Sequence, residues 1–469
     1  MKFTLLLGIL CSVSWAGSDN LGQDLPLFSI LPFIGILLSI AIIPLIAPTF
    51  WHRNFGKVSA FWAISFLLPF LFVYGIHETS YQFLHVLLLE YLPFIILLFS
   101  LFTISGGIRL KGSLIGTPYV NTGLILIGTL LASWMGTTGA AMLLIRPVLR
   151  ANKGRKHKIH TIVFFIFLVA NIGGSLTPLG DPPLFLGFLN GVDFFWTTTT
   201  MLMPMLLVSA ILLLMYFLID SYYYKKDNDN LKESSGDEKI GLDGSFNFIL
   251  IAGVIGAVLM SGFWKPQIEI PALLGIHLEI QNICRDLILL ILAGISWEFT
   301  QMDIRKLNGY TWFPILEVAK LFAGIFITII PAIAILRAGE NGALSGIIQL
   351  VTNSDGSPVN AMYFWLTGSL SSFLDNAPTY LVFFNLAGAS SGDMSMAAYL
   401  MEVIPSTLLA ISMGAVFMGA MTYIGNAPNF MVKSIAEENN ISMPSFFGFL
   451  GWSILLLIPV FILVSILFI

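Results

Sequence analysis

The chain has 469 residues, of which 57% are hydrophobic and 10% are charged, and its formal net charge is −4. Soluble domains contain about 25% charged residues, and disordered chains are poor in apolar residues, so the composition excludes both classes. The charge also excludes a basic surface for nucleic acid. Apolar runs of about 20 residues predict membrane-spanning helices, whereas the strands of a β-barrel would alternate apolar and polar residues.

The first 16 residues have the pattern of a secretory signal. Lys2 precedes the apolar run FTLLLGIL (3–10), and the small residues Ser14 and Ala16 fit a cleavage site. We therefore predict a signal peptide over 1–16, with an uncleaved membrane anchor as the alternative.

Long apolar segments follow, and each is a candidate for a helix within the bilayer. They span 29–48, 58–77, 82–105, 122–149, 160–190, 197–220, 246–264, 285–300, 312–337, 361–387, 399–431 and 446–469. The polar stretch KKDNDNLKESSGDEKIGLDGS (225–245) interrupts this pattern. We therefore expect a first transmembrane repeat with scaffold helices over 29–220, a cytoplasmic linker over 221–245, and a second transmembrane repeat over 246–469.

Basic residues collect on the cytoplasmic side of membrane proteins, and this rule orients the segments. Segment 122–149 follows Lys111 and ends in the basic stretch RANKGRKHK (150–158), so both of its ends belong in the cytoplasm. The sequence GTTGA (136–140) interrupts the segment. These observations predict a helical hairpin that enters the membrane and returns to the same side.

A second hairpin is predicted in segment 361–387, which is broken at LDNAP (374–378) and enters from the outside. Two broken helices also match, because SLTPLGDPPLF (175–185) and AMTYIGNAPNF (420–430) share four of eleven positions. Matching broken helices and opposite hairpin directions predict two inverted repeats. Paired interrupted segments of this kind indicate a binding site near the membrane midplane.

The interruptions of the apolar segments carry the candidate chemistry. They are GTTGA (136–140), NIGGSLTPLGDPP (171–183), SSFLDNAPT (371–379) and GAMTYIGNAPN (419–429). At bilayer depth, backbone without helical hydrogen bonds persists only where protein or a water-filled cavity surrounds it. Freed amides and half-helix N-termini suit an anion, whereas freed carbonyls with Asp, Asn and Thr oxygens suit Na⁺. The alternative is that Gly and Pro are simply common in membrane helices.

Ionisable groups within the membrane are costly and are therefore functional candidates. Asp375 lies beside Asn376, and Asp181 lies near Thr177, so we expect both carboxylates to bind Na⁺ or a proton. The alternative is that each carboxylate caps the end of a broken helix. Asn426 occupies the position that matches Asp181, so the two halves are chemically unequal.

Further ionisable residues lie within apolar segments, namely Glu90, Arg146, Glu317 and Lys320. Glu317 and Lys320 are three positions apart and share one helix face, so they form either an ion pair or part of a proton relay, which Glu90 could also join. Arg146 follows the first hairpin. It either binds a substrate carboxylate through its guanidinium or extends to the cytoplasmic interface.

Three stretches, TTGAAMLLIRPVLRAN (137–152), HTIVFFIFLVANIGGSLTPLGDPPLFLGFL (160–189) and SSFLDNAPTYLVFF (371–384), resemble the citrate-transporter branch of the ion transporter superfamily. Its members are often labelled sodium:proton antiporters of the NhaD type. The resemblance covers nearly the whole chain after the signal. It implies two inverted repeats, each with a re-entrant hairpin and a broken helix, often as a homodimer in the bacterial inner membrane, with an elevator-like motion of the hairpin domain.

The resemblance also implies a set of binding positions at the hairpin tips and broken helices. They are Thr137, Thr138, Gly139, Asn171, Gly173, Gly174, Thr177, Gly180, Asp181, Asp375, Asn376, Thr379, Thr422, Gly425 and Asn426. The tips, Gly-Thr-Thr-Gly (136–139) and Leu-Asp-Asn-Ala (374–377), differ from the Ser-Asn-Thr tips of the dicarboxylate branch. An Asp at one tip and another at a broken helix suit cation and proton exchange better than carboxylate binding.

We therefore expect a secondary transporter that an ion gradient drives. The first hypothesis is a Na⁺/H⁺ antiporter in which Asp181 and Asp375 bind Na⁺ and protons in turn. The second is a Na⁺- or H⁺-coupled symporter of citrate or a dicarboxylate, and the third is a passive channel or a membrane scaffold. The chain has no phosphate loop and no cluster of metal ligands, so we expect no enzyme activity and no cofactor beyond the transported ions.

Overall fold

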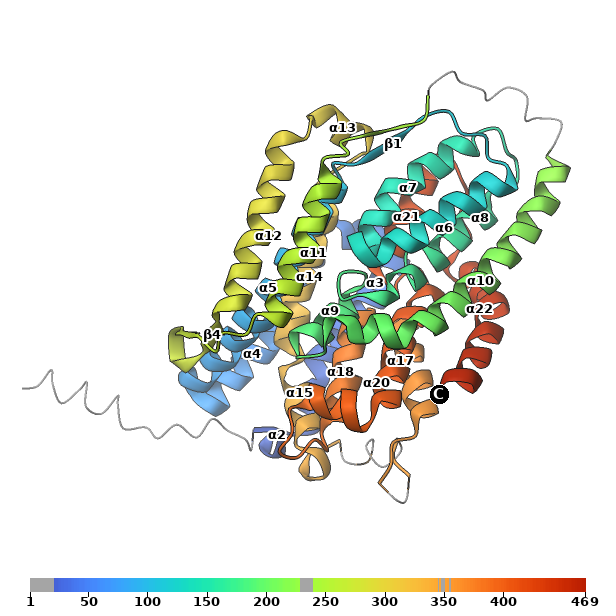
Figure 1. The fold of residues 1–469 in the computed structure, drawn as a ribbon. Coiled ribbons are helices and arrows are strands. Elements are labelled where there is room, and N and C mark those ends of the chain that lie inside the picture. Colours follow the sequence, from blue (N-terminus) through green and yellow to red (C-terminus); the bar gives the residue numbers. More distant parts are fainter. Residues whose placement is uncertain (1–20, 228–238, 345, 347–350, 354–355) are drawn as a thin grey trace, which may run out of the picture.

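The computed structural model describes residues 21–227, 239–344, 346, 351–353 and 356–469, and Figure 1 shows their arrangement. The predicted signal peptide and part of the predicted linker lie outside the described residues. Within the described part of the chain, seven helices are long and apolar enough to cross a membrane, or up to nine if each of two bent pairs counts as one span. The protein is an all-α, multi-pass membrane protein, as predicted.

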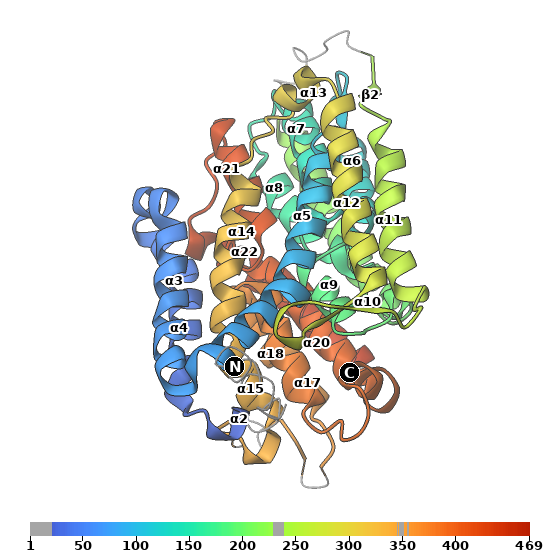
Figure 2. The same ribbon diagram turned by 90° about the vertical axis from the view of Figure 1, so that its left-hand side faces the viewer.

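The chain begins with helices of which α3 and α4 form one side of the molecule (Figure 2). They are α2 (Leu21–Asp24), η1 (Leu27–Ile30), α3 (Leu31–Ile46), α4 (Pro48–Val86), η2 (Leu87–Tyr91) and α5 (Leu92–Ser105). The predicted break between segments 58–77 and 82–105 is confirmed, although it lies a little earlier, at Gly75, whose φ of 80° and ψ of 173° are not helical. The Thr79 hydroxyl donates to the Gly75 carbonyl (2.8 Å) in the first turn after this break.

The first hairpin and the first broken helix come next in the chain. They are α6 (Pro118–Met135), α7 (Thr137–Ala151), α8 (Ile159–Leu168), η3 (Ile172–Leu176), α9 (Pro182–Leu189) and α10 (Phe194–Lys226). The predicted interruption at 136–140 is confirmed, because Gly136 has a φ of 80° and separates α6 from α7. Asn152, after α7, donates to the side-chain oxygen of Asn121, near the start of α6 (2.8 Å). The outer ends of the two helices therefore meet, as in a hairpin.

Two short antiparallel strand pairs lie outside the helical body. They are β1 (Arg109–Lys111) with β2 (Gly241–Asp243), and β3 (Glu269–Pro271) with β4 (His277–Glu279). In the first pair, Lys111 and Arg109 contact the Asp243 carboxylate at 2.6 and 3.3 Å. The hydrogen bond from Lys111, followed by the charges of Lys111 and Arg109, holds the pKa of Asp243 below its ordinary value.

The next elements pack beside the N-terminal helices (Figure 2). They are α11 (Asn247–Phe263), η5 (Leu273–Gly275), α12 (Ile280–Phe299), α13 (Met302–Leu307), α14 (Phe313–Thr328), α15 (Ile330–Arg337) and η6 (Gly339–Asn341). The predicted continuous segment 312–337 is instead bent by 40° between α14 and α15. Pro331 explains the bend, because it has no amide hydrogen with which to continue the helix.

The second hairpin and the second broken helix complete the chain. They are α17 (Asn360–Phe373), α18 (Asn376–Gly388), α19 (Met396–Ala398), η7 (Tyr399–Val403), α20 (Pro405–Met418), η8 (Gly419–Met421), α21 (Ala427–Glu438) and α22 (Phe446–Phe468). The predicted breaks at 374–378 and 419–429 are both confirmed. The predicted start of the span at 399 is wrong, because the helix of 396–403 lies at 103° to the one that begins at Pro405.

Helices α8 and α20 lie at the centre of the molecule. Every residue of α20 from Ala410 onward is buried, and α8 is buried from His160 onward. Both helices are apolar around nearly their whole circumference, which is typical of a helix that is surrounded by protein. Each leads directly into a break, so the fold places both broken segments in its interior.

The basic residues that sequence analysis assigned to the cytoplasm lie at one end of the molecule. Figure 1 shows α13, β1 and the loop between α7 and α8 at the top, α2 at the bottom, and β4 and the C-terminus below the middle. The top end carries Arg109, the stretch 150–158, and Lys306. We call it the basic end, and the other the opposite end.

Candidate functional site

The carboxylate of Asp181 lies at the centre of a buried hydrogen-bond network. Its Oδ1 accepts from the Thr137 hydroxyl (3.3 Å) and from Nδ2 of Asn426 (2.9 Å), and its Oδ2 accepts from Nδ2 of Asn376 (2.6 Å). All four residues are at most 2% exposed. The three donors come from the first hairpin, the second broken helix and the second hairpin, so the fold assembles this site from both halves of the chain.

Helix N-termini surround this carboxylate. Asp181 is the N-cap residue of α9, Asn426 is the N-cap residue of α21, and Thr137 and Asn376 are the first residues of α7 and α18. Each helix N-terminus carries a partial positive charge. The network therefore balances one buried negative charge with neutral donors and four helix dipoles, and not with a cationic side chain.

Each broken helix forms the same kind of hydrogen bond with its own hairpin. The Thr177 hydroxyl donates to the backbone carbonyl of Ser133 in α6, and the Thr422 hydroxyl donates to the carbonyl of Ser372 in α17. Each hydroxyl also accepts from the amide two residues later, at 3.2 Å in both cases. Thr177 and Thr422 thus satisfy backbone groups that the breaks leave without helical partners, as membrane interiors require.

The two breaks also need glycine for close backbone approach. A Cβ at Gly180 would overlap the carbonyl of Gly174, and a Cβ at Gly425 would overlap the carbonyls of Gly419 and Ser371. Sequence analysis included Gly180 and Gly425 among the positions of the broken helices. The structure gives a steric reason for both residues.

A second layer of asparagines supports the network. Asn171 Nδ2 donates to Oδ1 of Asn429 (2.7 Å), and its own Oδ1 accepts from Asn426 (3.3 Å). Asn429 in turn donates to the carbonyls of Gly419 and Thr422 at 2.8 and 2.9 Å. Sequence analysis identified Asn171 but missed Asn429, although its place in the GNAPN motif, one turn after Asn426, was a usable signal.

One oxygen in the site lacks a partner. Asn376 is fully buried, and its Oδ1 has no hydrogen-bond partner among the described residues, while its Nδ2 is bonded to Asp181. A buried acceptor without a donor needs an explanation such as a water or an ion. Carboxylate and amide oxygens are the ligands that hard cations prefer, so Asp181 and Asn376 together fit a small cation or a proton.

Residues 22–469 match the family described as "Putative citrate transport". The chain belongs to this family. No sequence among the curated proteins matches the chain. Because the family is one of transporters and the fold contains several membrane-spanning helices, the protein is a secondary transporter.

The remaining tip residues of this citrate-transport family member form no hydrogen bond with Asp181. Asp375 accepts from the amide of Ala377 (3.1 Å) and so caps α18, as the alternative interpretation predicted. The Thr379 hydroxyl donates to the backbone carbonyl of Asp375 (3.0 Å). Gly139 packs against Ser105 of α5, and Thr138 is half-buried beside it. The cap geometry makes Asp375 a neighbour of the site rather than a direct partner of Asp181.

The four ionisable residues of the apolar segments lie outside this network. Glu317 accepts from the Trp51 indole (3.2 Å), while the Lys320 ammonium lies over the Phe55 ring at 5.5 Å. The predicted Glu317–Lys320 ion pair does not form, because α14 packs along α4 and each side chain meets a different aromatic residue there. Glu90 lies in η2, a π-helical turn.

Arg146 does not reach the site. A Cβ at Gly309, in the loop after α13, would overlap its guanidinium, so this side chain extends toward the basic end. The position of Arg146 therefore agrees with the second interpretation, in which the side chain extends toward the membrane interface. Among the described residues, no cationic side chain forms an ion pair with Asp181.

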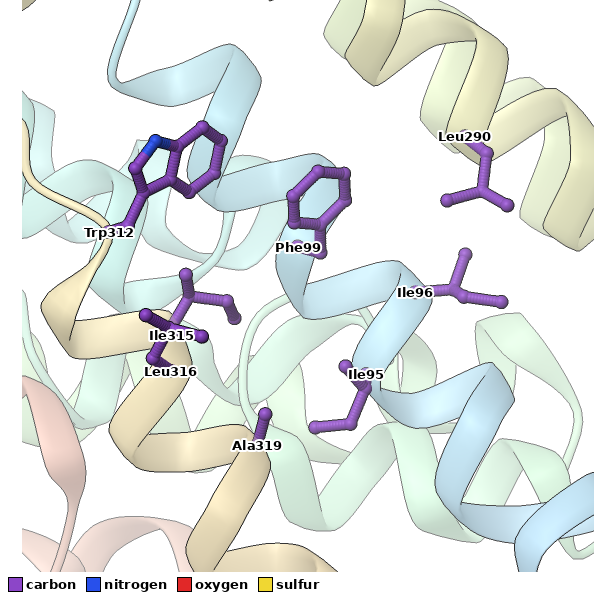
Figure 3. A pocket seen from close by; sticks show the side chains of 8 residues that line it. All are labelled: Ile95, Ile96, Phe99, Leu290, Trp312, Ile315, Leu316 and Ala319. Atoms are coloured by element: carbon purple, nitrogen blue, oxygen red, sulfur yellow. The ribbon is translucent and has the colours of Figure 1, made fainter.

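An open apolar hollow of the transporter lies elsewhere, on the outer surface between α5, α12 and α14 (Figure 3). It has a volume of about 420 Å³, and Phe99, Trp312 and Leu290 are among its lining residues. Because only apolar surface lines it, this groove suits contact with lipid chains and offers no ligand for an ion.

Proposed function

We propose that this secondary transporter exchanges Na⁺ for H⁺ and that Asp181 holds the two ions in turn. The observation that carries the proposal is the pairing of the buried Asp181 carboxylate with the unpartnered Oδ1 of Asn376. Na⁺ would be coordinated by these oxygens, and a proton would bind to the carboxylate itself. Thr137 and Asn426 hold Asp181 in place from the other side.

The charge of the site supports a cation. Na⁺ and H⁺ carry the same charge, so either ion neutralises Asp181, and the buried site never holds an uncompensated charge while it is loaded. Citrate or a dicarboxylate would bring further negative charges to a site that already contains a carboxylate. No Lys, Arg or His among the described residues forms an ion pair with Asp181 that could offset them.

The proposal includes alternating access by an elevator-like motion of two inverted repeats. The equivalent bonds of Thr177 and Thr422 to their own hairpins support it, since each hairpin and its broken helix would then move as one unit. We propose that the protein works as a homodimer in a bacterial inner membrane, and that the ion gradient is its only energy source.

Symport of citrate or a dicarboxylate with Na⁺ or H⁺ is the second candidate. The description of the family and the four helix N-termini around Asp181 favour it, because the partial positive charge of a helix N-terminus attracts carboxylates. In that case a cation bound to Asp181 would neutralise its carboxylate, and the helix N-termini could then attract the carboxylate of the substrate.

Ion flux in proteoliposomes tests the proposal. An outward Na⁺ gradient should acidify the lumen of vesicles that contain the wild-type protein, because the exiting Na⁺ draws protons inward. Asp181→Asn should abolish the exchange. Asp193→Asn is the matched control, because Asp193 is exposed at the start of α10. Retained exchange in Asp181→Asn would contradict the role of Asp181, and Na⁺-dependent uptake of radiolabelled citrate without Na⁺/H⁺ exchange would favour symport.

A further inference from the structure

Buried titratable residues also gather at the basic end, where the loop after α7 meets the last turns of α10. They are Arg155, His157, His160, Asp220 and Asp227, which we call the Asp220 cluster. None of these residues takes part in the hydrogen-bond network of Asp181. The cluster therefore needs an explanation of its own.

Asp220 receives three donors in the interior of the protein. Arg155 Nη1 and His160 Nε2 both contact Oδ1 of Asp220, at 2.6 and 2.7 Å. Nδ2 of Asn121, from α6, donates to Oδ2 at 3.2 Å. The side chains of Arg155 and Asp220 are 0% exposed. A charged pair this deeply buried persists only when its hydrogen bonds are well satisfied.

Asp227 forms the second half of the cluster. Nδ1 of His157 contacts Oδ1 of Asp227 at 2.6 Å, the backbone amide of His157 donates to Oδ2 at 3.0 Å, and Arg155 Nε lies 3.8 Å away. Burial raises the pKa of Asp227, but the hydrogen bonds from His157 outweigh burial, so the pKa lies below its ordinary value. Asp227 is 1% exposed and His157 is 30% exposed, so the cytoplasm reaches this half of the cluster through His157.

Aromatic rings and further charged side chains surround the two imidazoles. The ring of Tyr223 stacks on both His157 and His160, at centroid distances of 5.1 and 5.0 Å. Tyr216 lies 6.0 Å from His160, and the Arg155 guanidinium lies over Tyr224. Helix α21 packs on α8, and its Lys433 and Glu437 form an ion pair with each other. In the loop between α7 and α8, Lys156 is exposed and Lys158 is half-buried.

The charges of the cluster are unequal. One arginine faces two aspartates, so the cluster has a net charge of −1 when both histidines are neutral and no net charge when one is protonated. An uncompensated buried charge is costly, so the closed arrangement favours the protonated form. Histidine is the side chain whose charge ordinarily changes between about pH 5 and 8.

We infer that the Asp220 cluster is a regulatory proton site that is separate from the transport site. One proton on the His157–His160 pair closes the loop between α7 and α8 onto α10, and its loss at higher cytoplasmic pH loosens that contact. The position matters because α7 runs from this loop to Thr137, and Asn152, in the same loop, is bonded to Asn121 at the start of the hairpin. The cluster thus controls how firmly the first hairpin is held at its base.

Hydrogen exchange of the purified full-length protein tests this inference without relying on transport. The measurement is the protection factor, corrected for intrinsic exchange, of peptides that cover 150–160 between about pH 5.5 and 8.5. In the wild-type protein this protection should be lost progressively as the pH rises through the range in which histidine side chains give up their proton. Protection that stays constant with pH would overturn the inference.

Asp227→Asn is the decisive variant, because it removes the excess negative charge. The loop should then stay protected at high pH, although the introduced amide is a weaker hydrogen-bond acceptor than the aspartate. If Asp227 only held the loop in place, the substitution would instead lower the protection at every pH. The double variant His157→Gln/His160→Gln should be poorly protected throughout. His277→Gln is the matched control, since His277 forms an exposed pair with Glu269 (2.7 Å) at the opposite end and should leave the profile unchanged.

Transport measurements separate this inference from the proposed function. If the loop behaves as described and no Na⁺/H⁺ exchange is found, the proton site stands and the transported ion must be revised. If exchange is found and the Asp227→Asn protein has the same pH profile of exchange and of loop protection as the wild-type protein, the proton site is wrong.

Discussion

Asn376 donates to the carboxylate of Asp181 across 195 positions of sequence, with an Nδ2–Oδ2 distance of 2.6 Å. This bond joins the tip of the second hairpin to the first broken helix. The other end of the same amide, Oδ1, has no partner among the described residues. Asn376 therefore restrains Asp181 and offers an oxygen to an ion at the same time.

Asn376→Ala should weaken Na⁺ binding without removing the carboxylate. We expect the KM for Na⁺ to rise about tenfold or more, because a contact with a charged partner is worth about 1.5–3 kcal/mol. Asn385→Ala is the matched control, since Asn385 lies on the same helix but accepts from Arg337 (2.8 Å). The relevant measurement is the rate of Na⁺-driven proton movement at several Na⁺ concentrations. An unchanged KM in Asn376→Ala would show that Oδ1 is not a ligand.

Thr177→Val and Thr422→Val should lower stability rather than ion affinity. Each substitution removes a hydroxyl that bonds a carbonyl in a hairpin and an amide in a break, at a cost of about 1–3 kcal/mol. Thermal unfolding monitored by tryptophan fluorescence should show the loss. Thr199→Val, on the exposed face of α10, should unfold like the wild-type protein. A strong rise in KM for Na⁺ with normal stability would instead make these hydroxyls ligands.

Gly180→Ala should be far more harmful than Gly256→Ala. The new Cβ at 180 would overlap the carbonyl of Gly174, whereas nothing lies within 4 Å of the same position at Gly256. We expect overpacking to cost about 1–3 kcal/mol at Gly180, because the neighbouring atom is backbone and cannot rotate away. The yield of folded protein after size-exclusion chromatography measures the difference. Equal yields of the two variants would contradict the close approach described for this break.

The β1–β2 pairing should weaken in acid. The pKa of Asp243 is lowered in the folded protein, so its contribution is present above the unfolded pKa of about 3.9 and is lost as the pH falls through the folded value. The side chain is 25% exposed, so we expect an effect of no more than about 1 kcal/mol. Hydrogen exchange of peptides around 241–243 at pH 7 and below 4 measures it. Asp243→Asn should show no acid-dependent loss, and a loss equal to that of the wild-type protein would assign the effect to another group.

Much of the fold was predictable because membrane helices have a strong local signal. Long apolar runs located the helices, and Gly, Pro and Asp within those runs located the breaks. The bend before Pro331 was missed, because a single proline inside an apolar run is compatible with either a continuous or a bent helix.

The residues of the site could be predicted from the sequence, but the hydrogen bonds between them could not. Asp181, Asn376 and Asn426 were all identified from the breaks, yet only the fold shows that the amides converge on one carboxylate. Asp375 and Asp181 lie in similar sequence contexts, but their side chains have different partners. Asp375 caps α18, whereas Asp181 accepts hydrogen bonds from three other elements. The Asp220 cluster was missed altogether, because His160 and Asp220 are 60 positions apart and carry no motif.

The pairing of β1 with β2 has a mechanical consequence. Strand β1 precedes the first hairpin, and strand β2 precedes α11. Their pairing at the basic end therefore acts as a clasp that holds together the two ends of the block made of the first hairpin, the first broken helix and α10. A block whose two chain ends are held together at one point can rotate about that point while it moves past its neighbours. The clasp would therefore act as a pivot, and the largest displacements of this block would occur far from it, toward the opposite end.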